Sequence, residues 1–469
     1  MTTGEARAPA TVITGAPIDG DELESDVVVV GAGLAGLTAA RALSAAGASV
    51  IALEARDRVG GRTLSEPVGD GKVVDLGAAW IGPTQNRVAA LARELGEPTF
   101  RTHTTGESLI ELGGRVRRYS GTVPRLGVPV LIDVGQARWR LERLARRVSP
   151  AAPWAARGAA RLDAQSFATW IARNVRTRAA RDLLRIAGKT VWGMEPEDMS
   201  LLHVLFYLRA AGGLDPLLDT EGGAQQDRFV RGSQALALRM AEQLGERVVT
   251  GAPVEAIEQR GDSVRVTSGA ATVRARRAVV ALAPALAARI HYVAPLPGPR
   301  DQLSQRMPLG SLTKCIAIYR EPFWRPAGLS GEALSDVGPA TITFDASPPD
   351  GSPGVLLGFV GGSEARTLGR VAVTERRRAV IDGFVRLFGP RAAAPERYVE
   401  RDWSAEEWSR GGPTASFSPG GWSACGHALR APVGRIHWAG TETATVWSGF
   451  MDGAVRSGER AAAEVVAAL

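Results

Sequence analysis

Residues 26–62 constrain the fold more than any other stretch, because they predict one complete β-α-β unit. The valine-rich run at 26–30 indicates a buried parallel strand. Residues 34–46 carry the small side chains of a closely packed helix, and a second apolar strand follows at 48–53. Parallel strands joined through a helix predict a Rossmann-like α/β domain.

Three glycines join the first strand to the helix at G-x-G-x-x-G spacing, and they indicate a dinucleotide site. Gly31, Gly33 and Gly36 allow the backbone to approach a pyrophosphate, whose charge lies at the helix N-terminus. Glu54 ends the second strand and is placed to accept hydrogen bonds from ribose hydroxyls. An acidic residue here disfavours a ribose 2′-phosphate, so we do not expect NADP.

The composition indicates a globular protein with a dispersed positive charge. Of 469 residues, 45% are hydrophobic and 22% charged, a balance typical of soluble domains. The net charge is +7, and all basic residues except Lys72, Lys189 and Lys314 are arginines. These arginines are scattered, without an RNA-binding signature. We therefore expect a solvated Arg-rich surface, with no nucleic acid or membrane partner.

The cysteines and histidines indicate neither a disulfide framework nor a metal site. Cys315 and Cys425 lie far apart, and the five histidines have no metal-ligand spacing. Residues 1–24 lack the apolar core of a signal peptide and are expected to form a disordered tail. No apolar stretch is long enough to span a bilayer. A cytoplasmic location follows as an expectation.

The nucleotide-binding pattern is interrupted twice along the chain. The first interruption is mostly helical and includes a hairpin that turns at Gly113–Gly114. Its helices are expected at 136–148, 167–188 and 200–211. The second is rich in strands. We expect a nucleotide-binding domain at 25–100, 226–303 and 404–469, and a discontinuous α+β substrate domain at 101–225 and 304–403.

Five motifs occur in a fixed order: GAGLAG, EARDRVGGRT, LGAAWIGPTQNRV, MPLGSLTKCIAIYREPFW and WAGTETATVWSGFMDGAVRSGERAA. With these motifs the chain resembles the flavin-containing monoamine oxidase family from about Asp26 to its C-terminus. The resemblance implies FAD and a flavoprotein fold of the two-dinucleotide-binding-domain type. It also implies that an amine is oxidised to an imine, which hydrolyses to a carbonyl compound, while oxygen is reduced to hydrogen peroxide. Family members are often homodimers.

Several residues are expected to hold the cofactor. The Gly60–Gly61–Arg62 turn can bring a guanidinium onto the pyrophosphate. The helix from Met451 carries about half a positive charge at its N-terminus, aimed at the flavin's pyrimidine carbonyl. The glycines Gly453 and Gly458 weaken this helix, which indicates close approach. By the resemblance, the cofactor residues are Gly31, Gly33, Ala35, Gly36, Glu54, Ala55, Arg56, Gly61, Arg62, Gly77, Ala78, Ala79, Trp80, Val254, Trp403, Gly440, Thr441, Glu442 and Met451.

Lys314 is the strongest single candidate for a catalytic residue. In SLTKCIAIYR the strand period of two places Lys314 on one face with Leu312, Ile316 and Ile318. A lysine among large aliphatic side chains is partly buried, and burial lowers its pKa. The resemblance implies that this lysine holds a water beside the flavin N5 and promotes reaction with oxygen. The alternative is a lysine that snorkels at a strand edge.

The sequence departs from the family at the flavin tether and in the substrate pocket. Gly412 stands where many animal members attach FAD through a cysteine, so we expect noncovalent FAD. Family active sites stack two aromatic rings; Phe450 matches one, but Pro413 replaces the other. Trp422 is a candidate for the missing ring. By the resemblance, Gln225 lines the pocket and Leu218 lies at an entrance gate.

Three readings of the function remain open from the sequence. The first is a monoamine oxidase. The second, an oxidase of L-amino acids or polyamines, requires an arginine for a carboxylate or an acidic residue for a distal ammonium. The third, from a different class, is an inactive flavoprotein that binds a partner. Lys314, Phe450 and the motif at 440–442 disfavour this last reading.

Overall fold

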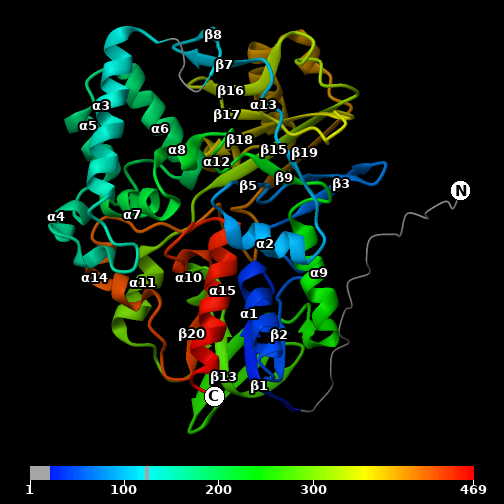
Figure 1. The fold of residues 1–469 in the computed structure, drawn as a ribbon, viewed down its shortest axis with the longest axis vertical. Coiled ribbons are helices and arrows are strands. Elements are labelled where there is room, and N and C mark those ends of the chain that lie inside the picture. The colour runs from blue at the N-terminus through cyan, green and yellow to red at the C-terminus, as the bar shows by residue number, and fades with distance from the viewer. Residues whose placement is uncertain (1–21, 122–125) are drawn as a thin grey trace, which may run out of the picture.

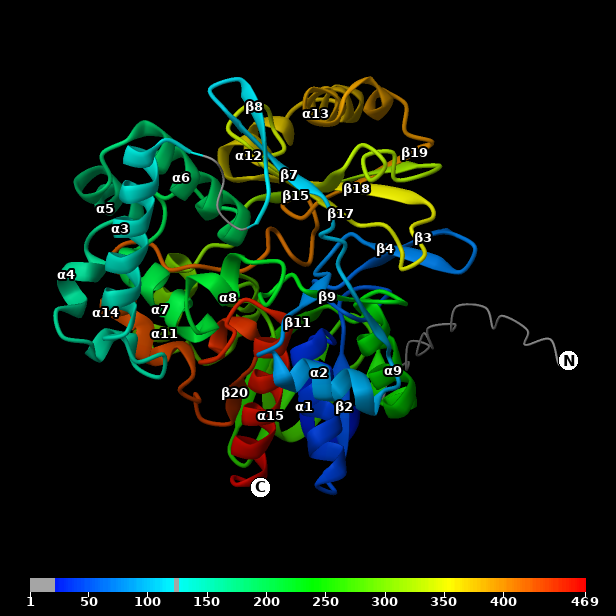
Figure 2. The ribbon, with the colours of Figure 1, turned by 45° about the horizontal axis from the view of Figure 1, so that its top comes forward.

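The computed structural model describes residues 22–121 and 126–469. Two large sheets and a helical layer surround the middle of the molecule (Figures 1 and 2). The expected disordered tail lies mostly outside the described residues. Its last three residues contradict the expectation, because 22–24 form the start of strand β1 and pair with β13.

The first sheet contains the β-α-β unit predicted from the sequence. Its strand order is β10-β2-β1-β13-β12-β11-β14, and β20 also pairs with β13. The strands β1, β2, β10, β13 and β20 run parallel. The bounds are β1 (Glu22–Val30), β2 (Val50–Leu53), β10 (Val248–Val249), β11 (Val254–Arg260), β12 (Ser263–Ser268), β13 (Thr272–Val280), β14 (His291–Tyr292) and β20 (Ile436–Trp438).

Three helices from distant parts of the chain lie beside one another at this sheet (Figure 1). They are α1 (Leu34–Ala45), α9 (Gln234–Leu244) and α15 (Met451–Val466). A Cβ added to Gly458 would lie 2.3 Å from the Ala35 carbonyl oxygen, so this glycine lets α15 pack against α1. Gly453 similarly packs against the Trp447 carbonyl. The close approach indicated by these two glycines is therefore to protein backbone.

The second sheet has the order β19-β15-β18-β17-β16-β7-β8. Cys315 and Ala317 of β15 face the core beneath α13, whereas Ile316 and Ile318 face the opposite core with Leu64. This alternation is the one predicted for the lysine strand. The bounds are β7 (Glu107–Leu112), β8 (Arg115–Tyr119), β15 (Leu312–Tyr319), β16 (Leu329–Ser335), β17 (Ile342–Asp345), β18 (Gly354–Gly361), β19 (Arg397–Asp402), α12 (Gly362–Leu368) and α13 (Val373–Phe388).

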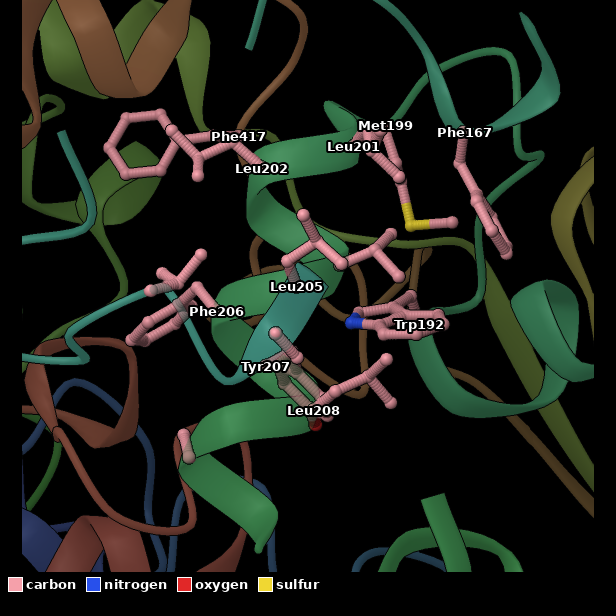
Figure 3. Packing of buried hydrophobic residues seen from close by; sticks show 14 of the residues in the cluster. Phe167, Trp192, Met199, Leu201, Leu202, Leu205, Phe206, Tyr207, Leu208 and Phe417 are labelled. Carbon is pink, nitrogen blue, oxygen red and sulfur yellow. The ribbon is translucent and has the colours of Figure 1, made fainter. Parts of the chain in front are cut away.

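The helical layer packs around α7, which is buried over nearly its whole length (Figure 3). The helix expected at 167–188 is in fact two helices. The break at 175–177 is held by Asp133, whose carboxylate accepts hydrogen bonds from the Arg176 and Thr177 amides. The bounds are α3 (Val128–Ala145), α4 (Ala159–Asp163), α5 (Phe167–Asn174), α6 (Arg178–Trp192), α7 (Leu201–Ala211), α8 (Leu214–Leu218), α11 (Gly298–Arg306) and α14 (Gly421–Cys425).

Smaller elements connect these layers. They include a hairpin of β3 and β4 and a three-stranded sheet of order β5-β9-β6. The bounds are β3 (Ser65–Gly69), β4 (Lys72–Asp75), β5 (Trp80–Ile81), β6 (Thr99–Arg101), β9 (Asp227–Phe229), α2 (Asn86–Glu94) and α10 (Pro284–Ala287). None of the helices in the described residues has the length and apolarity needed to cross a membrane.

Candidate active site

A cavity of about 600 Å³ begins at the carboxyl ends of the parallel strands. Its walls include Val30, Leu53, Ala281 and Gly440, which end or follow β1, β2, β13 and β20. From there it extends to the second sheet and to helices α6 and α7. Ligands in open α/β sheets bind at this edge. The cavity thus joins the predicted nucleotide site to the predicted substrate region.

The glycine turns bring two backbone segments together at the nucleotide end. The Gly60 amide donates to the Ala32 carbonyl at 2.9 Å, and a Cβ on Gly61 would lie 3.3 Å from the Gly33 Cα. Helix α1 begins here without a side-chain cap, so its first amides are free to bind an anion. Gly36 does not line the cavity. A Cβ there would lie 1.9 Å from the Gly31 carbonyl oxygen, so its role is close packing of helix on turn.

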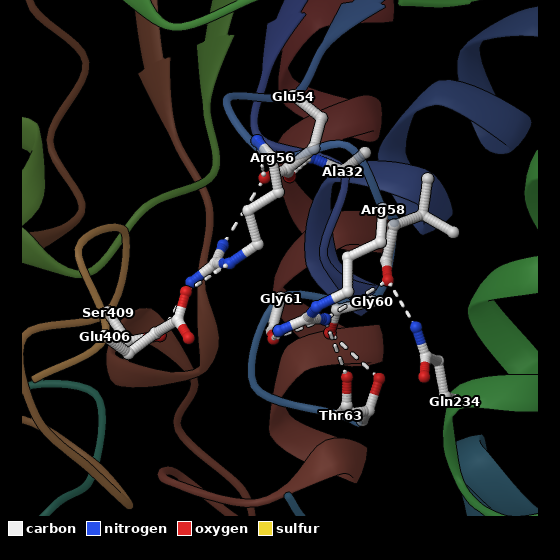
Figure 4. Close-up of polar contacts among 11 residues, drawn as sticks. Ala32, Glu54, Arg56, Arg58, Gly60, Gly61, Thr63, Gln234, Glu406 and Ser409 are labelled. Carbon is white, nitrogen blue, oxygen red and sulfur yellow. Dashed lines mark hydrogen bonds and ion pairs between the residues drawn. The ribbon is translucent and has the colours of Figure 1, made fainter. Parts of the chain in front are cut away.

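Glu54 and Arg56 line the end of the cavity where the sequence predicts a ribose (Figure 4). The Glu54 carboxylate accepts hydrogen bonds from the Ala32 amide at 2.8 Å and from the Arg56 amide at 3.1 Å. The Arg56 guanidinium donates to Glu406 at 3.1 Å and to the Ser409 hydroxyl at 2.8 Å. Both side chains are held before any ligand binds, which suits recognition of a ribose.

Arg62 lines the cavity, but its guanidinium is already paired. It donates to the two Glu442 carboxylate oxygens at 2.5 and 3.0 Å, and to the Pro413 carbonyl at 2.9 Å. Burial alone would raise the pKa of Glu442, yet the Arg62 charge holds that pKa below its usual value. The structure therefore shows Arg62 in an ion pair at the cavity wall, and its contact with a phosphate stays a prediction. Glu442 lies behind Arg62 and does not reach the cavity.

Lys314 is buried in the middle of the cavity wall. Its Nζ donates to the Gly77 carbonyl at 2.8 Å and lies 5.1 Å from the centre of the Trp80 ring. Burial lowers the Lys314 pKa to about 7; the Asp75 carboxylate opposes this shift, and the Arg228 guanidinium adds to it. The lysine is 1% exposed and does not snorkel at a strand edge. It can change protonation state near neutral pH.

The N-terminus of α15 forms the opposite wall. Phe450 is the N-cap residue and has no side-chain cap, and both Phe450 and Met451 line the cavity. The Thr441 hydroxyl donates to the Phe450 carbonyl at 2.7 Å and fixes the start of the helix. The amides of its first turn and the positive end of its dipole lie at the cavity wall, as expected for a cofactor clamp.

At the substrate end, two of the four predicted residues do not line the cavity. Pro413 and Gln225 line the cavity. Leu218 is 45% exposed and does not line it, because α8 turns the neighbouring Leu217 inward instead. Trp422 is fully buried and stacks on Trp154, so it cannot replace the missing ring. The assignment of Trp422 to the pocket is wrong, whereas the place of Leu218 at an entrance gate stays a prediction.

Sequence reasoning missed several residues of this end. Tyr207 lines the cavity, and its ring centre lies 5.9 Å from that of Phe450 at an angle of 41°. Trp447 lies nearer to Phe450, at 4.9 Å between ring centres, but of these two neighbours only Tyr207 lines the cavity. On α7 it sits within an unbroken apolar run, which gave no sign of a polar face. The other missed residues that line this part of the cavity include Thr190, Val191, Phe344 and Phe359.

The residues present fit FAD along the length of the cavity. The nucleotide end offers glycine turns, uncapped α1 amides and the Glu54 carboxylate. The next section is lined by Gly77, Ala78 and Ala79, whose small side chains allow a planar ring to lie against backbone. Trp403 closes this wall and donates to the Leu76 carbonyl at 2.9 Å. All other predicted cofactor residues, apart from Gly36 and Glu442, line the same cavity.

Fold and site together define an FAD-dependent oxidoreductase. Comparison with known proteins supports this class. A family model described as "Flavin containing amine oxidoreductase" matches residues 34–466. The chain belongs to this family of flavin-containing amine oxidoreductases, which are enzymes that oxidise amines.

The sequence and structural relatives agree with this membership. The chain is 50% identical over 444 residues to AofH of Mycobacterium tuberculosis, which carries the name of a flavin-containing monoamine oxidase; the match covers 95% of this chain and 97% of AofH. It is 35% identical to cyclohexylamine oxidase from Brevibacterium oxydans, with a TM-score of 0.90 over 95% and 99% of the two chains. It is 34% identical to putrescine oxidase bound to putrescine, with a TM-score of 0.92 over 95% and 100%.

Proposed function

We propose that this amine oxidase acts on monoamines, with oxygen as the electron acceptor and hydrogen peroxide as a product. The observation that supports monoamines is the placement of charge along the cavity. Six charged side chains line it in the described residues: Glu54, Arg56, Arg62, Glu255, Arg289 and Lys314. At the substrate end, none of these six side chains is an unpaired charge.

Four of the six lie at the nucleotide end. Glu54 and Arg56 contact each other. Glu255 follows directly after Val254, and the Arg289 guanidinium lies 5.8 Å from the ring centre of Trp408, next to the Ser409 that Arg56 contacts. The remaining two are Arg62, which is paired with Glu442, and Lys314 at the cofactor.

This distribution separates the alternatives left open by the sequence. A diamine or polyamine requires an acidic partner for its second ammonium, and an amino acid requires a free guanidinium for its carboxylate. Within the described residues, neither lines the cavity around Phe450 and Pro413. An apolar pocket also favours the neutral amine, which is the form that can be oxidised. Family membership likewise sets aside an inactive flavoprotein.

Bound FAD would supply the chemistry, by accepting a hydride, which is two electrons and one proton, from the amine α-carbon. The chain supplies binding and orientation. Phe450 and Tyr207 offer ring faces for the substrate, and the α15 N-terminus favours negative charge at the flavin. Lys314, with a pKa of about 7, can hold a water by hydrogen bonding and give a proton to reduced oxygen.

We infer noncovalent FAD, because neither Cys315 nor Cys425 lines the cavity and both are buried. Acid precipitation should release the yellow colour into the supernatant; colour retained in the pellet would contradict this. Two further proposals keep their basis in the sequence: a cytoplasmic location and a homodimer. The domain division is also a proposal, supported by the assignment of strands to two sheets.

A peroxide-coupled assay tests the function. We expect peroxide from 2-phenylethylamine, and at least about tenfold lower kcat/KM for 1,4-diaminobutane and L-phenylalanine, because each buries an unpaired charge. Equal or greater activity with the diamine or the amino acid would contradict the monoamine assignment. Amine oxidation without peroxide would contradict oxygen as the acceptor.

A further inference from the structure

Two buried charged side chains hold one short loop of the cavity wall. In this loop Gly77, Ala78 and Ala79 line the cavity. The Lys314 Nζ donates to the Gly77 carbonyl at 2.8 Å. Asp75, which ends β4 just before the loop, is 3% exposed. A carboxylate and an ammonium therefore act on the same few residues.

The Asp75 carboxylate fixes this loop through Ser233. Its Oδ1 accepts hydrogen bonds from the Ser65 hydroxyl at 2.8 Å and from the Ser233 amide at 2.9 Å. The Ser233 hydroxyl has one proton to donate. Its oxygen lies 2.5 Å from the Ala78 carbonyl oxygen and 3.3 Å from Asp75 Oδ1, so the proton belongs to the bond with Ala78. Asp75 thus sets the position of Ser233, which holds the loop backbone.

A buried guanidinium indicates that Asp75 is ionised. Arg228 is 4% exposed and donates to a backbone carbonyl. Two carboxylates, Asp75 and Asp345, favour its charge, but Asp345 already accepts a hydrogen bond from Arg325 at 2.7 Å. A buried arginine stays charged and needs a counter-charge. Burial raises the Asp75 pKa, and the positive charges of Lys314 and Arg228 oppose this rise. Asp75 is therefore the carboxylate left to balance Arg228.

The other groups around Lys314 bring no second negative charge. Arg228 acts on Lys314 with a charge of the same sign. On β19, Arg401 stands opposite Lys314 in the strand register, but its side chain is 40% exposed and pairs with Glu406. Strands β5 and β18 present aromatic rings to the ammonium. Among the described residues, Asp75 is thus the carboxylate that favours the charged form of Lys314.

We propose that Asp75 is a positioning residue for the reaction with oxygen, which keeps the Lys314 ammonium charged and holds the loop at 77–79 in place. Oxygen gains negative charge as it takes up electrons, so a neighbouring ammonium favours this step. To become hydrogen peroxide, oxygen takes two electrons and one proton from the reduced cofactor and a second proton through Lys314. This inference rests on the proposed use of oxygen as the electron acceptor.

Two variants with opposite charge effects test the role of Asp75. In stopped flow, reoxidation of the reduced wild-type enzyme by oxygen should slow as the pH rises, with a midpoint near 7, the pKa of Lys314. Asp75→Asn should lower this midpoint by about one pH unit, which slows reoxidation about fivefold at pH 7. Arg228→Gln removes a like charge and should raise the midpoint by about one pH unit.

Asp163→Asn is the matched control. Asp163 is also a buried carboxylate that accepts from a serine hydroxyl and a backbone amide, but it ends α4 in the helical layer. Its substitution should leave the midpoint unchanged. Ser233→Ala keeps the amide that binds Asp75 and removes the bond to Ala78. It should release FAD severalfold faster after dilution, without moving the midpoint.

A second readout does not depend on turnover. The flavin absorbance spectrum of the resting, FAD-loaded enzyme should change with pH at the same midpoints, and Lys314→Met should abolish this change. The spectrum also shows whether each variant is folded and loaded. If Asp75→Asn does not fold, the direction of the shift in Arg228→Gln decides.

Three outcomes separate the parts of the proposal. Midpoints that do not move in Asp75→Asn and Arg228→Gln, or that move in the same direction, would overturn the role of Asp75 and leave the proposed function intact. Unchanged FAD release in Ser233→Ala would overturn the holding of the loop. If the reduced wild-type enzyme does not react with oxygen, the proposed function itself fails.

Discussion

Replacing Lys314 by methionine should stabilise the folded protein while impairing its reaction with oxygen. Burial lowers the Lys314 pKa from 10.5 to about 7. At a pH where Lys314 is protonated in both the folded and the unfolded chain, this lowering of its pKa by about 3.5 corresponds to a loss of about 5 kcal/mol of folding stability. The substitution also removes the hydrogen bond from Lys314 to the Gly77 carbonyl, which stabilises the wild-type fold by about 1 kcal/mol. Methionine fills a similar volume without charge, so the expected gain at pH 6 is about 4 kcal/mol.

The stability gained by Lys314→Met should decrease as the pH rises. Between pH 7 and 10.5 the unfolded chain holds the Lys314 proton and the folded chain does not. The unfolded state binds more protons in this window, so wild-type stability rises with pH by about 1.4 kcal/mol per unit from this group. The advantage of Lys314→Met should therefore shrink from about 4 kcal/mol at pH 6 to near zero at pH 9.5.

Urea unfolding of the FAD-loaded proteins at pH 6, 8 and 9.5 measures this difference. Lys189→Met is the matched control. Lys189 is paired with Glu195 and Glu364, so its loss should not stabilise the protein at any of these pH values. A difference between Lys314→Met and wild type that stays constant from pH 6 to 9.5 would refute the reasoning. In stopped flow, Lys314→Met should also slow flavin reoxidation by oxygen.

Three further substitutions, the last with a matched control variant, test other parts of the structure. His203→Phe should remove part of the acid sensitivity. Burial lowers the His203 pKa to about 3, so only the unfolded chain takes up this proton as the pH falls below 6.5, and the wild-type fold loses about 2 kcal/mol of stability at pH 5. Thermal midpoints of wild type and variant that decline equally from pH 7 to 5 would contradict this. Glu442→Gln should lower the thermal midpoint, because it leaves Arg62 without its buried counter-charge at a cost of about 3–5 kcal/mol; an unchanged midpoint would count against the pair. Gly36→Ala should destabilise the protein and weaken FAD retention, because the added Cβ would collide with the Gly31 carbonyl. The control Gly135→Ala lies at an exposed helix position with open space and should stabilise the protein by up to about 1 kcal/mol. Similar effects of both substitutions would argue against the packing role of Gly36.

The sequence was sufficient for the nucleotide end because its signals are local. The glycine turn, the helix and Glu54 lie within one short stretch, and backbone geometry alone determines where they go. Lys314 was also accessible, since strand periodicity predicts its face and burial follows from its neighbours. Most residues assigned through the family resemblance line the cavity for the same reason: their motifs occupy turns and strand ends.

The substrate end was harder to predict because it depends on helix rotation and long-range pairing. Leu217 and Leu218 are adjacent and chemically identical, and only the orientation of α8 decides which one faces the cavity. Trp422 has several aromatic neighbours within the helical core, which no local pattern revealed. The Arg62–Glu442 pair joins residues 380 positions apart. Tertiary packing settled each of these cases.

The most direct test of the central claim is anaerobic mixing of the FAD-loaded enzyme with single amines, followed by flavin absorbance near 450 nm. The charge distribution in the cavity predicts rapid, saturable bleaching by 2-phenylethylamine and much slower bleaching by 1,4-diaminobutane and L-phenylalanine. Bleaching by the diamine or the amino acid at the rate of the monoamine would contradict it, as would no bleaching by any amine.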